Sequence, residues 1–211
     1  MENLDHGVNV AIIGAGWAGL AAAVALAQAN IRVSVFEAAR QMGGRARSVE
    51  IEGMALDNGQ HVLIGAYSET LRLMQTVGAD PKQLLARLPL AIEYPGKFSL
   101  RVPRRPAPLH LAEALLTASG LSWGERIAAV RFIKAMRSKA YRIPIDMPVA
   151  ALLAQHRQTG ALARYLWEPL CVSALNTPAT SASAQTFLNV VRDGLDGACE
   201  ASDFLIPRAD L

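Results

Sequence analysis

The sequence predicts an α/β protein in which a strand-helix-strand unit at the N-terminus is followed by a mostly helical region. The first observation is an apolar β-type run at 8–13 that leads directly into a glycine-rich turn and then into small helix-forming residues at 20–29. A second β-type run follows at 31–36, as in a parallel βαβ unit. From residue 109 onward apolar residues recur mainly at helical spacing, which predicts helices.

The glycine-rich turn has the composition of a phosphate-binding turn. It supplies six candidate site residues, namely Gly14, Ala15, Gly16, Trp17, Ala18 and Gly19. Gly14 permits a sharp turn, Gly16 lets the backbone approach a pyrophosphate, and Gly19 lets the helix pack closely on the strand. Free N–H groups at the start of the helix can then hold an anion without a lysine. We therefore interpret this unit as dinucleotide-binding, in preference to a glycine turn between buried elements.

An acid and a second glycine turn follow the second strand. Glu37 lies 18 residues after Gly19 and can accept hydrogen bonds from a ribose that carries no 2′-phosphate. Beyond it, the N–H groups of Gly43 and Gly44 and the guanidinium of Arg45 can close over a pyrophosphate from the other side. An NAD domain has no use for this extension, so it favours FAD. The alternative is a solvated loop that carries two arginines.

These motifs resemble a known family. With the segment Leu56, Asp57, Asn58, Gly59, Gln60 and His61, they look like the FAD-binding half of the flavin amine oxidase and phytoene desaturase superfamily. Softer similarity at 57–67, 167–171 and 205–211 resembles the hydroxysqualene dehydroxylases of hopanoid synthesis. The resemblance implies a Rossmann-like FAD-binding domain, and it adds Gly59, Gln60 and His61 as residues near the flavin ring. A hydrogen-bonded loop histidine is the alternative for His61.

Composition limits the other possibilities. With 211 residues, 52% of them hydrophobic, the chain can bury a sizeable core. Its two cysteines, Cys171 and Cys199, form neither a metal-type spacing nor a disulfide framework, and residues 1–6 do not resemble a secretory signal, so we expect a cytoplasmic protein. We expect no bound metal and no nucleic-acid partner, because neither a ligand spacing nor an aromatic-basic surface is present.

The remaining elements are predicted from periodicity and from turn residues. We expect a short strand at 49–54, a helix at 67–77, a hairpin at 90–102, irregular structure around the prolines at 103–108, helices at 109–117 and 122–142, and a helix at 182–191 that is capped by Ser181. Pro169 should kink or end the apolar run at 161–170.

Basic residues are concentrated in the middle of the chain. Residues 81–142 contain 12 Lys or Arg and 3 Asp or Glu, against 5 and 8 in residues 1–80 and 4 and 7 in residues 143–211. One side of the predicted helix at 126–142 is basic, with Arg126, Arg131, Lys134, Arg137 and Arg142. The other side is apolar, with Ala129, Phe132, Ile133, Met136 and Ala140. Such a helix can bind the anionic inner surface of the cytoplasmic membrane. The alternative is a helix whose basic side is solvated and whose apolar side packs on a core.

Together these observations predict an incomplete FAD-binding domain at 1–80 and a substrate or cap region at 81–211. By resemblance the chain is the N-terminal half of an FAD-dependent oxidoreductase that acts on an isoprenoid lipid, with hydroxysqualene as substrate and squalene as product. An amine oxidase, a carotenoid or phytoene desaturase, and a catalytically silent nucleotide-binding fragment remain alternatives. Because an incomplete sheet leaves an open edge, we also expect self-association, or pairing with the missing half.

Overall fold

The computed structural model describes residues 8–57, 59 and 61–208. The chain divides into two compact units, which are described separately. The first unit contains the described residues up to Leu63, then Ser68–Ala86 and the chain from Leu205 on; the second contains Ile64–Tyr67 and Arg87–Phe204. The proposed domain boundary at residue 80 stays a prediction. The mixed α/β class is confirmed.

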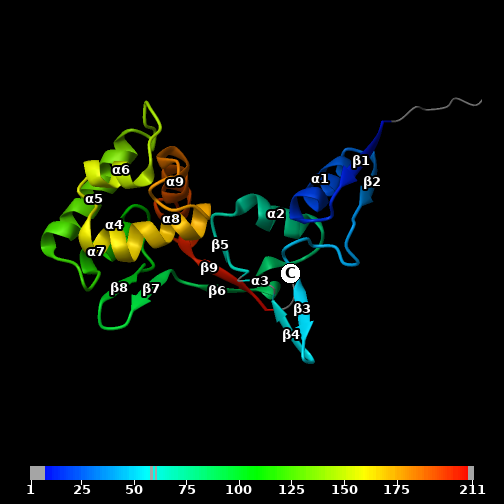
Figure 1. Cartoon of the computed structure of the whole chain (residues 1–211), viewed down its shortest axis with the longest axis horizontal. Helices are drawn as coiled ribbons and strands as arrows, with labels where there is room; N and C mark the ends of the chain where they lie inside the picture. The colour runs from blue at the N-terminus through cyan, green and yellow to red at the C-terminus, as the bar shows by residue number, and fades with distance from the viewer. Residues whose placement is uncertain (1–7, 58, 60, 209–211) are drawn as a thin grey trace, which may run out of the picture. The chain divides into compact units, whose positions relative to one another are not determined.

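The first unit begins with the predicted βαβ motif (Figure 1). Strand β1 (Asn9–Ile13) leads into helix α1 (Trp17–Gln28), and β2 (Arg32–Phe36) returns parallel to β1. In this register Ile13 lies opposite Phe36, so both strands end at the edge where the glycine turn begins. Parallel strands require a crossover connection, which the helix provides.

Residues 48–57 form a hairpin, whereas the sequence predicted a single strand at 49–54. Strands β3 (Ser48–Ile51) and β4 (Met54–Asp57) pair antiparallel around Glu52 and Gly53, which both have positive φ angles, 53° and 77°. Two left-handed residues are what a two-residue hairpin turn requires. The sequence signal was present in the Glu-Gly pair, but it was not recognised.

The predicted helix at 67–77 is α2 (Ser68–Thr76), and Gly78 follows it with φ 83°. Two further elements were not predicted. Helix α3 (Pro81–Leu84) is capped by Asp80, whose side chain accepts from the Lys82 N–H, and β6 (Leu85–Leu88) follows it directly. Two more strands, β5 (Leu63–Ile64) and β9 (Phe204–Pro207), include the residues at which the chain passes from one unit to the other.

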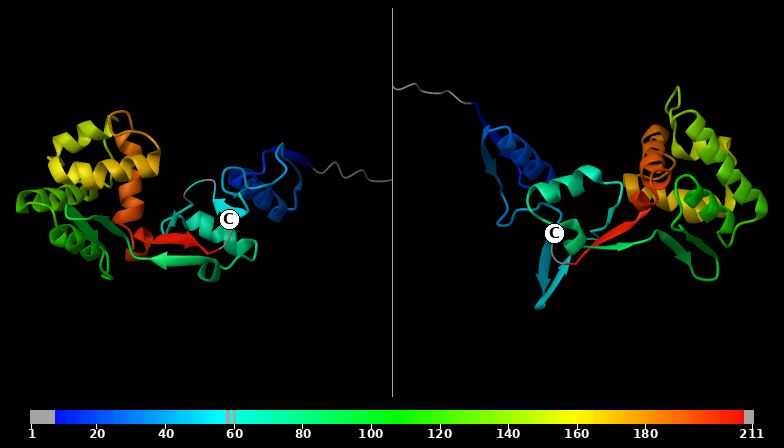
Figure 2. Two further views of the ribbon diagram at one scale, coloured as in Figure 1. Left: turned by 60° about the horizontal axis from the view of Figure 1, so that its bottom comes forward. Right: turned by 180° about the vertical axis from the view of Figure 1, so that it is seen from behind.

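The second unit is mostly helical (Figure 2). The predicted hairpin is present as β7 (Ala91–Tyr94) and β8 (Phe98–Arg101), with Gly96 at φ 70° in the turn. After the proline-rich segment come nine helical segments: α4 (Leu109–Thr117), α5 (Trp123–Ser138), α6 (Val149–Gln155), α7 (Gly160–Leu162), η1 (Ala163–Trp167), α8 (Glu168–Leu175), α9 (Ala184–Val190), η2 (Val191–Leu195) and η3 (Cys199–Ser202). Segments η1 and η2 are π-helical turns, and η3 is a 3₁₀ helix.

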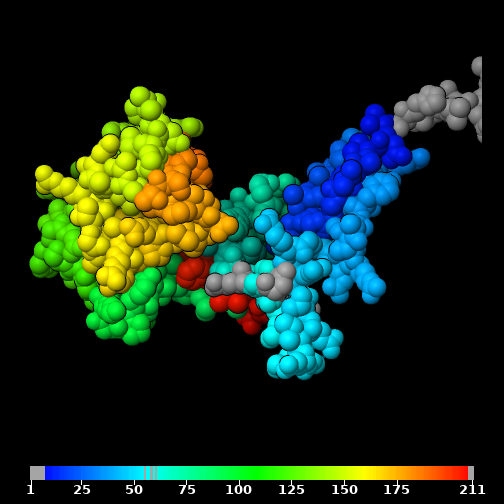
Figure 3. Space-filling model, in the orientation of Figure 1, coloured from blue at the N-terminus to red at the C-terminus, as the bar shows by residue number. Residues whose placement is uncertain are grey.

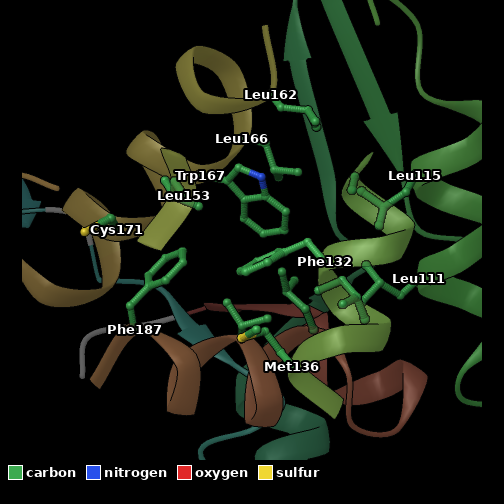
Figure 4. Close-up of a cluster of buried hydrophobic side chains, with 14 of the residues drawn as sticks. Leu111, Leu115, Phe132, Met136, Leu153, Leu162, Leu166, Trp167, Cys171 and Phe187 are labelled. Atoms are coloured by element: carbon green, nitrogen blue, oxygen red, sulfur yellow. The ribbon is translucent and has the colours of Figure 1, made fainter. Parts of the chain in front are cut away.

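A single core holds these helices together (Figure 4). Trp167 lies at its centre, between Phe132 of α5 and Phe187 of α9, with ring centroids 5.5 and 6.3 Å away and edge-to-face geometry. All three rings are buried. The indole N–H donates to Gln158 Oε1 at 3.0 Å, so the buried polar end of the tryptophan is satisfied. The helices therefore form one continuous body (green to orange in Figure 3).

Three helix predictions need correction. Helix α5 ends at Ser138 instead of continuing to 142, because Ala140 and Tyr141 have left-handed φ angles of 49° and 56°. The last helix is capped by Ser183, whose side chain accepts from Thr186 N–H, and not by Ser181. Of the two outcomes predicted for Pro169, a kink or an end of the run at 161–170, the end is wrong: the preceding turn widens into η1, where the N–H of residue 168 bonds the carbonyl of residue 163. Widening relieves the clash between a proline ring and the carbonyl four residues earlier.

The βαβ motif has little cover within its own unit. None of the residues of α1 is buried, although alanine, leucine and valine lie on all sides of this helix. Ile13 is 91% exposed and Phe36 is 59% exposed. A helix that is apolar all round is normally buried. Among the described residues, we find no helix with the length and apolar character needed to cross a membrane.

Candidate functional site

The two glycine turns of the first unit meet at the N-terminal end of α1. The N–H of Gly43 donates to the carbonyl of Ala15 at 2.8 Å, and the N–H of Gly14 donates to Phe36 O at 2.7 Å. A Cβ on Gly44 would lie 3.1 Å from Gly16 Cα, which leaves almost no space for a side chain between the turns. Sequence segments about thirty residues apart therefore form one backbone cradle.

Glycine is required at two positions of the first turn for different reasons. Gly14 has φ 97°, a conformation that side chains rarely adopt. At Gly19 the constraint is space, because a Cβ would lie 1.9 Å from the carbonyl oxygen of Gly14. The helix therefore starts directly against the end of β1.

The cradle suits an anion such as a pyrophosphate. Helix α1 has Gly16 as its N-cap, with no side chain bonded to the cap and no acidic residue in the first turn. The N–H groups of Trp17, Ala18 and Gly19 belong to this first turn, where a helix offers no carbonyl partners. Together with the positive end of the helix dipole, these N–H groups favour a bound anion. These residues fit the pyrophosphate of a dinucleotide.

Glu37 lies against the same turn. Its Oε2 accepts from the N–H of Ala15 at 2.7 Å and its Oε1 accepts from the N–H of Ala39 at 2.8 Å. These two bonds, from Ala39 first and Ala15 second, lower the pKa of Glu37 below its ordinary value. The carboxylate is therefore ionised and held in place, and each oxygen keeps a lone pair that can accept from a hydroxyl group.

Two arginines follow the second glycine turn, Arg45 and Arg47. Arg45 is exposed, whereas the charge of Arg47 contributes to the lowered pKa of Glu37. The Nε of Arg47 is buried and has no hydrogen-bond partner among the described residues. The sequence prediction named Arg45 and did not name Arg47, and the predicted contact of Arg45 with a pyrophosphate stays a prediction.

The other predicted residues are placed as follows. The side chain of Trp17 lines a cavity of about 340 Å³ between α1 and α2, together with Leu73 and Met74, so its contribution to an anion site is its N–H group. Gly59 is exposed and His61 is half-buried. Gln60 lies outside the described residues. The predicted contacts of Gly59, Gln60 and His61 with a flavin ring therefore stay predictions.

Comparison with known proteins identifies the family. A family profile described as flavin containing amine oxidoreductase matches residues 17–198. The chain belongs to this family. Because the family is flavin-containing, the cofactor is a flavin, in agreement with the sequence prediction.

Individual relatives are similar over different lengths. Hydroxysqualene dehydroxylase of Zymomonas mobilis subsp. mobilis is 31% identical over 199 residues, which cover 87% of this chain and 43% of that protein. The chloroplastic/chromoplastic zeta-carotene desaturase of Zea mays is 36% identical over 119 residues, which cover 54% of this chain and 21% of that protein. The crystal structure of an oxidoreductase from Methanosarcina mazei has a TM-score of 0.62 at 17% identity and covers 96% of this chain and 46% of that one. The chain thus spans less than half the length of these relatives, and the last comparison concerns the fold alone.

Proposed function

We propose that this chain is part of an FAD-dependent oxidoreductase that removes the hydroxyl group of hydroxysqualene by reduction and forms squalene. The observation that carries the proposal is the double glycine cradle with Glu37 beside it, which suits a ribose and a pyrophosphate. The similarity to hydroxysqualene dehydroxylase over 87% of the chain supports the substrate.

The chain's own residues have a binding role in this proposal. The N–H groups at the start of α1 hold the pyrophosphate, and Glu37 holds a ribose hydroxyl. Bound FAD supplies hydride transfer, which protein side chains cannot perform. Loss of the hydroxyl as water also consumes a proton, for which we assign no donor.

A carotenoid desaturase is the second candidate, supported by the 36% identity to the zeta-carotene desaturase of Zea mays. There the flavin would accept hydride instead of donating it. An amine oxidase is favoured only by the family description. A nucleotide-binding chain without catalytic activity is the candidate from a different class.

The direction of the reaction separates these candidates. The assay uses a protein of the relatives' full length that includes this chain. It should convert hydroxysqualene to squalene anaerobically with reduced FAD. Zeta-carotene and a diamine should leave its oxidised flavin unchanged. A protein that reduces its flavin with zeta-carotene, and leaves hydroxysqualene untouched, would be a desaturase. One that retains no flavin would be the non-catalytic candidate.

We further propose peripheral binding to an anionic membrane through α5. Arg126 and Arg137 of the predicted basic side are engaged with the protein: Arg126 donates to Leu116 O at 2.8 Å, and Arg137 pairs with Asp196. Arg131 and Lys134 are exposed, and no partner is found for them in the part of the chain that the structure describes. Trp123, at the start of the helix, is 69% exposed, which suits an interfacial aromatic.

Vesicle sedimentation tests this proposal. Binding should require phosphatidylglycerol in phosphatidylcholine vesicles and should weaken as salt is added, because a Debye length of about 10 Å at 0.1 M salt screens exposed charges. A variant with Arg131→Glu and Lys134→Glu should bind less than Lys97→Glu, which changes an exposed lysine in the β7–β8 turn. Binding that ignores lipid charge and salt would refute an electrostatic contribution.

Finally, we propose that the uncovered βαβ motif associates with another polypeptide, either a second copy or a chain that supplies the rest of the relatives' length. The exposed Ile13 and Phe36 and the absence of buried residues in α1 support this. We expect sedimentation of the 211-residue chain to depend on concentration, and flavin titration to give weak binding. A monodisperse monomer that holds one FAD per chain would contradict both expectations.

A further inference from the structure

The helical unit contains an apolar cavity of about 170 Å³ that the proposed cofactor site does not use. Its lining comes from segments of the second unit that lie far apart in the sequence, and it includes Ile64, Ile92, Leu166, Leu170, Gly194 and Ser202. Ser202 is the one residue of this lining with a polar side chain, and its hydroxyl already donates to Cys199 O at 2.9 Å. The cavity therefore has no side-chain donor to offer a polar ligand. An apolar lining of this kind favours hydrocarbon ligands.

Both π-helical turns contribute to this cavity. Leu166 belongs to η1, and Gly194 and Leu195 belong to η2. Single π-helical turns are rare and are frequently found at functional sites. In η2 the N–H of Asp196 bonds Val191 O at 3.0 Å, which is the wide i to i+5 pattern. Two uncommon turns, separated by 23 residues of other structure (168–190), thus meet at the same space.

A glycine inside η2 keeps the cavity open. Gly194 is buried, and a Cβ at this position would lie 3.3 Å from Ile64 Cδ1, which is also part of the lining. Any larger side chain would enter the cavity. Because glycine weakens a helical segment relative to alanine, its presence here opposes local stability.

The far end of η2 is held by a buried histidine. Nε2 of His110, on α4, lies 3.0 Å from the carbonyl oxygen of Leu195. Since a carbonyl accepts, Nε2 carries the proton. The bond fixes the last residue of the widened turn and thereby the wall of the cavity.

We infer that this cavity binds one branched end of an apolar hydrocarbon chain, about the size of a single isoprene unit. A cavity of about 150 Å³ is large enough for benzene, so the present volume holds about six carbon atoms and not a whole squalene-sized molecule. Two uncommon π-helical turns and a buried glycine that opposes helix stability converge on one place. Only the identity of the natural ligand, an isoprenoid, rests on the proposed function.

The probe for this inference is 2-methyl-2-butene, added to the 211-residue chain with ¹³C-labelled isoleucine δ1 methyl groups. The methyl signals of Ile64 and Ile92 should shift and saturate, whereas Ile133, which lies in the core outside this cavity, should not. Gly194→Val should weaken binding at least tenfold. Val172→Ala, an exposed change on helix α8 outside the cavity lining, should leave it unchanged.

A second variant covers the case in which Gly194→Val does not fold. Leu170→Ala enlarges the cavity, so benzene and larger hydrocarbons should bind more tightly than to the wild type. Unshifted Ile64 and Ile92 signals in the wild type would overturn the inference even if hydroxysqualene is converted by the full-length protein. Saturable binding in a protein that does not convert hydroxysqualene would overturn the proposed function and leave the cavity inference standing.

Discussion

Replacement of Asp203 by alanine should destabilise the helical unit more than the loss of an exposed ion pair does. The carboxylate is 1% exposed and accepts from Arg87 at 3.0 Å and from Arg104 at 2.9 Å, so it joins chain segments more than ninety residues apart. Hydrogen bonding to Asp203 also raises the pKa of Arg104. Breaking a buried ion pair costs about 3–5 kcal/mol when the remaining charge stays buried.

The two arginines reduce this cost because they are not buried. Their side chains are 41% and 47% exposed, so water can solvate them once the carboxylate is gone. We therefore expect Asp203→Ala to lower the free energy of unfolding by about 2–3 kcal/mol, which corresponds to a melting temperature about 4–12 °C lower for a chain of this size. Asp203→Asn keeps one oxygen acceptor and should be milder.

Urea denaturation followed by tryptophan fluorescence measures this difference, because Trp167 is fully buried in the same unit. The matched control is Asp193→Ala, which removes an ion pair with Arg192 whose partners are both about half exposed. Exposed pairs contribute about 0–1 kcal/mol. If both variants unfold at the same urea concentration, the reasoning about the buried carboxylate is wrong.

Three other variants test local arguments. Gly19→Val should disrupt the start of α1, since a Cβ lies 1.9 Å from Gly14 O, and should weaken FAD binding in a fluorescence titration. Ser122→Ala removes half of a capping box and should lower the unfolding free energy by about 1 kcal/mol in urea. Burial and the bond to Asp196 raise the pKa of Tyr141, so its hydroxyl keeps its proton in the folded protein. The extra unfolding free energy of the wild type over Tyr141→Phe should be largest below about pH 10, the pKa of tyrosine in the unfolded chain, and should be lost as pH rises further. Thermal melts across alkaline pH measure this difference. A difference that does not change with pH would contradict the argument.

Local signals were sufficient where neighbouring residues determine the structure. Helix α4 has the predicted limits because prolines precede it, and the capping box at Ser122 and Glu125 starts α5 as predicted. The βαβ motif was also predicted from the sequence, because its glycines are required by close backbone contacts within the motif itself.

Predictions failed where distant residues decide the outcome. Helix α5 ends at Ser138, short of the predicted 142, and just beyond it the hydroxyl of Tyr141 bonds Asp196, 55 residues away. The π-helical turns η1 and η2 do not change the spacing of apolar residues in the sequence. The sequence therefore did not predict the cavity that they line. In the candidate site, the charge of Arg47 contributes to the lowered pKa of Glu37, a relation that only the folded turn shows.

The interleaved order of the two units affects how the protein can be made. The helical unit starts at Ile64 and is not complete until Phe204, and the first unit needs residues from Leu205 on. At roughly 5–20 residues per second, a ribosome takes about 10–40 s to reach this point. During that time the βαβ motif, already synthesised, has its apolar surface open to solvent. We expect this surface to make the nascent chain prone to aggregation until another polypeptide covers it.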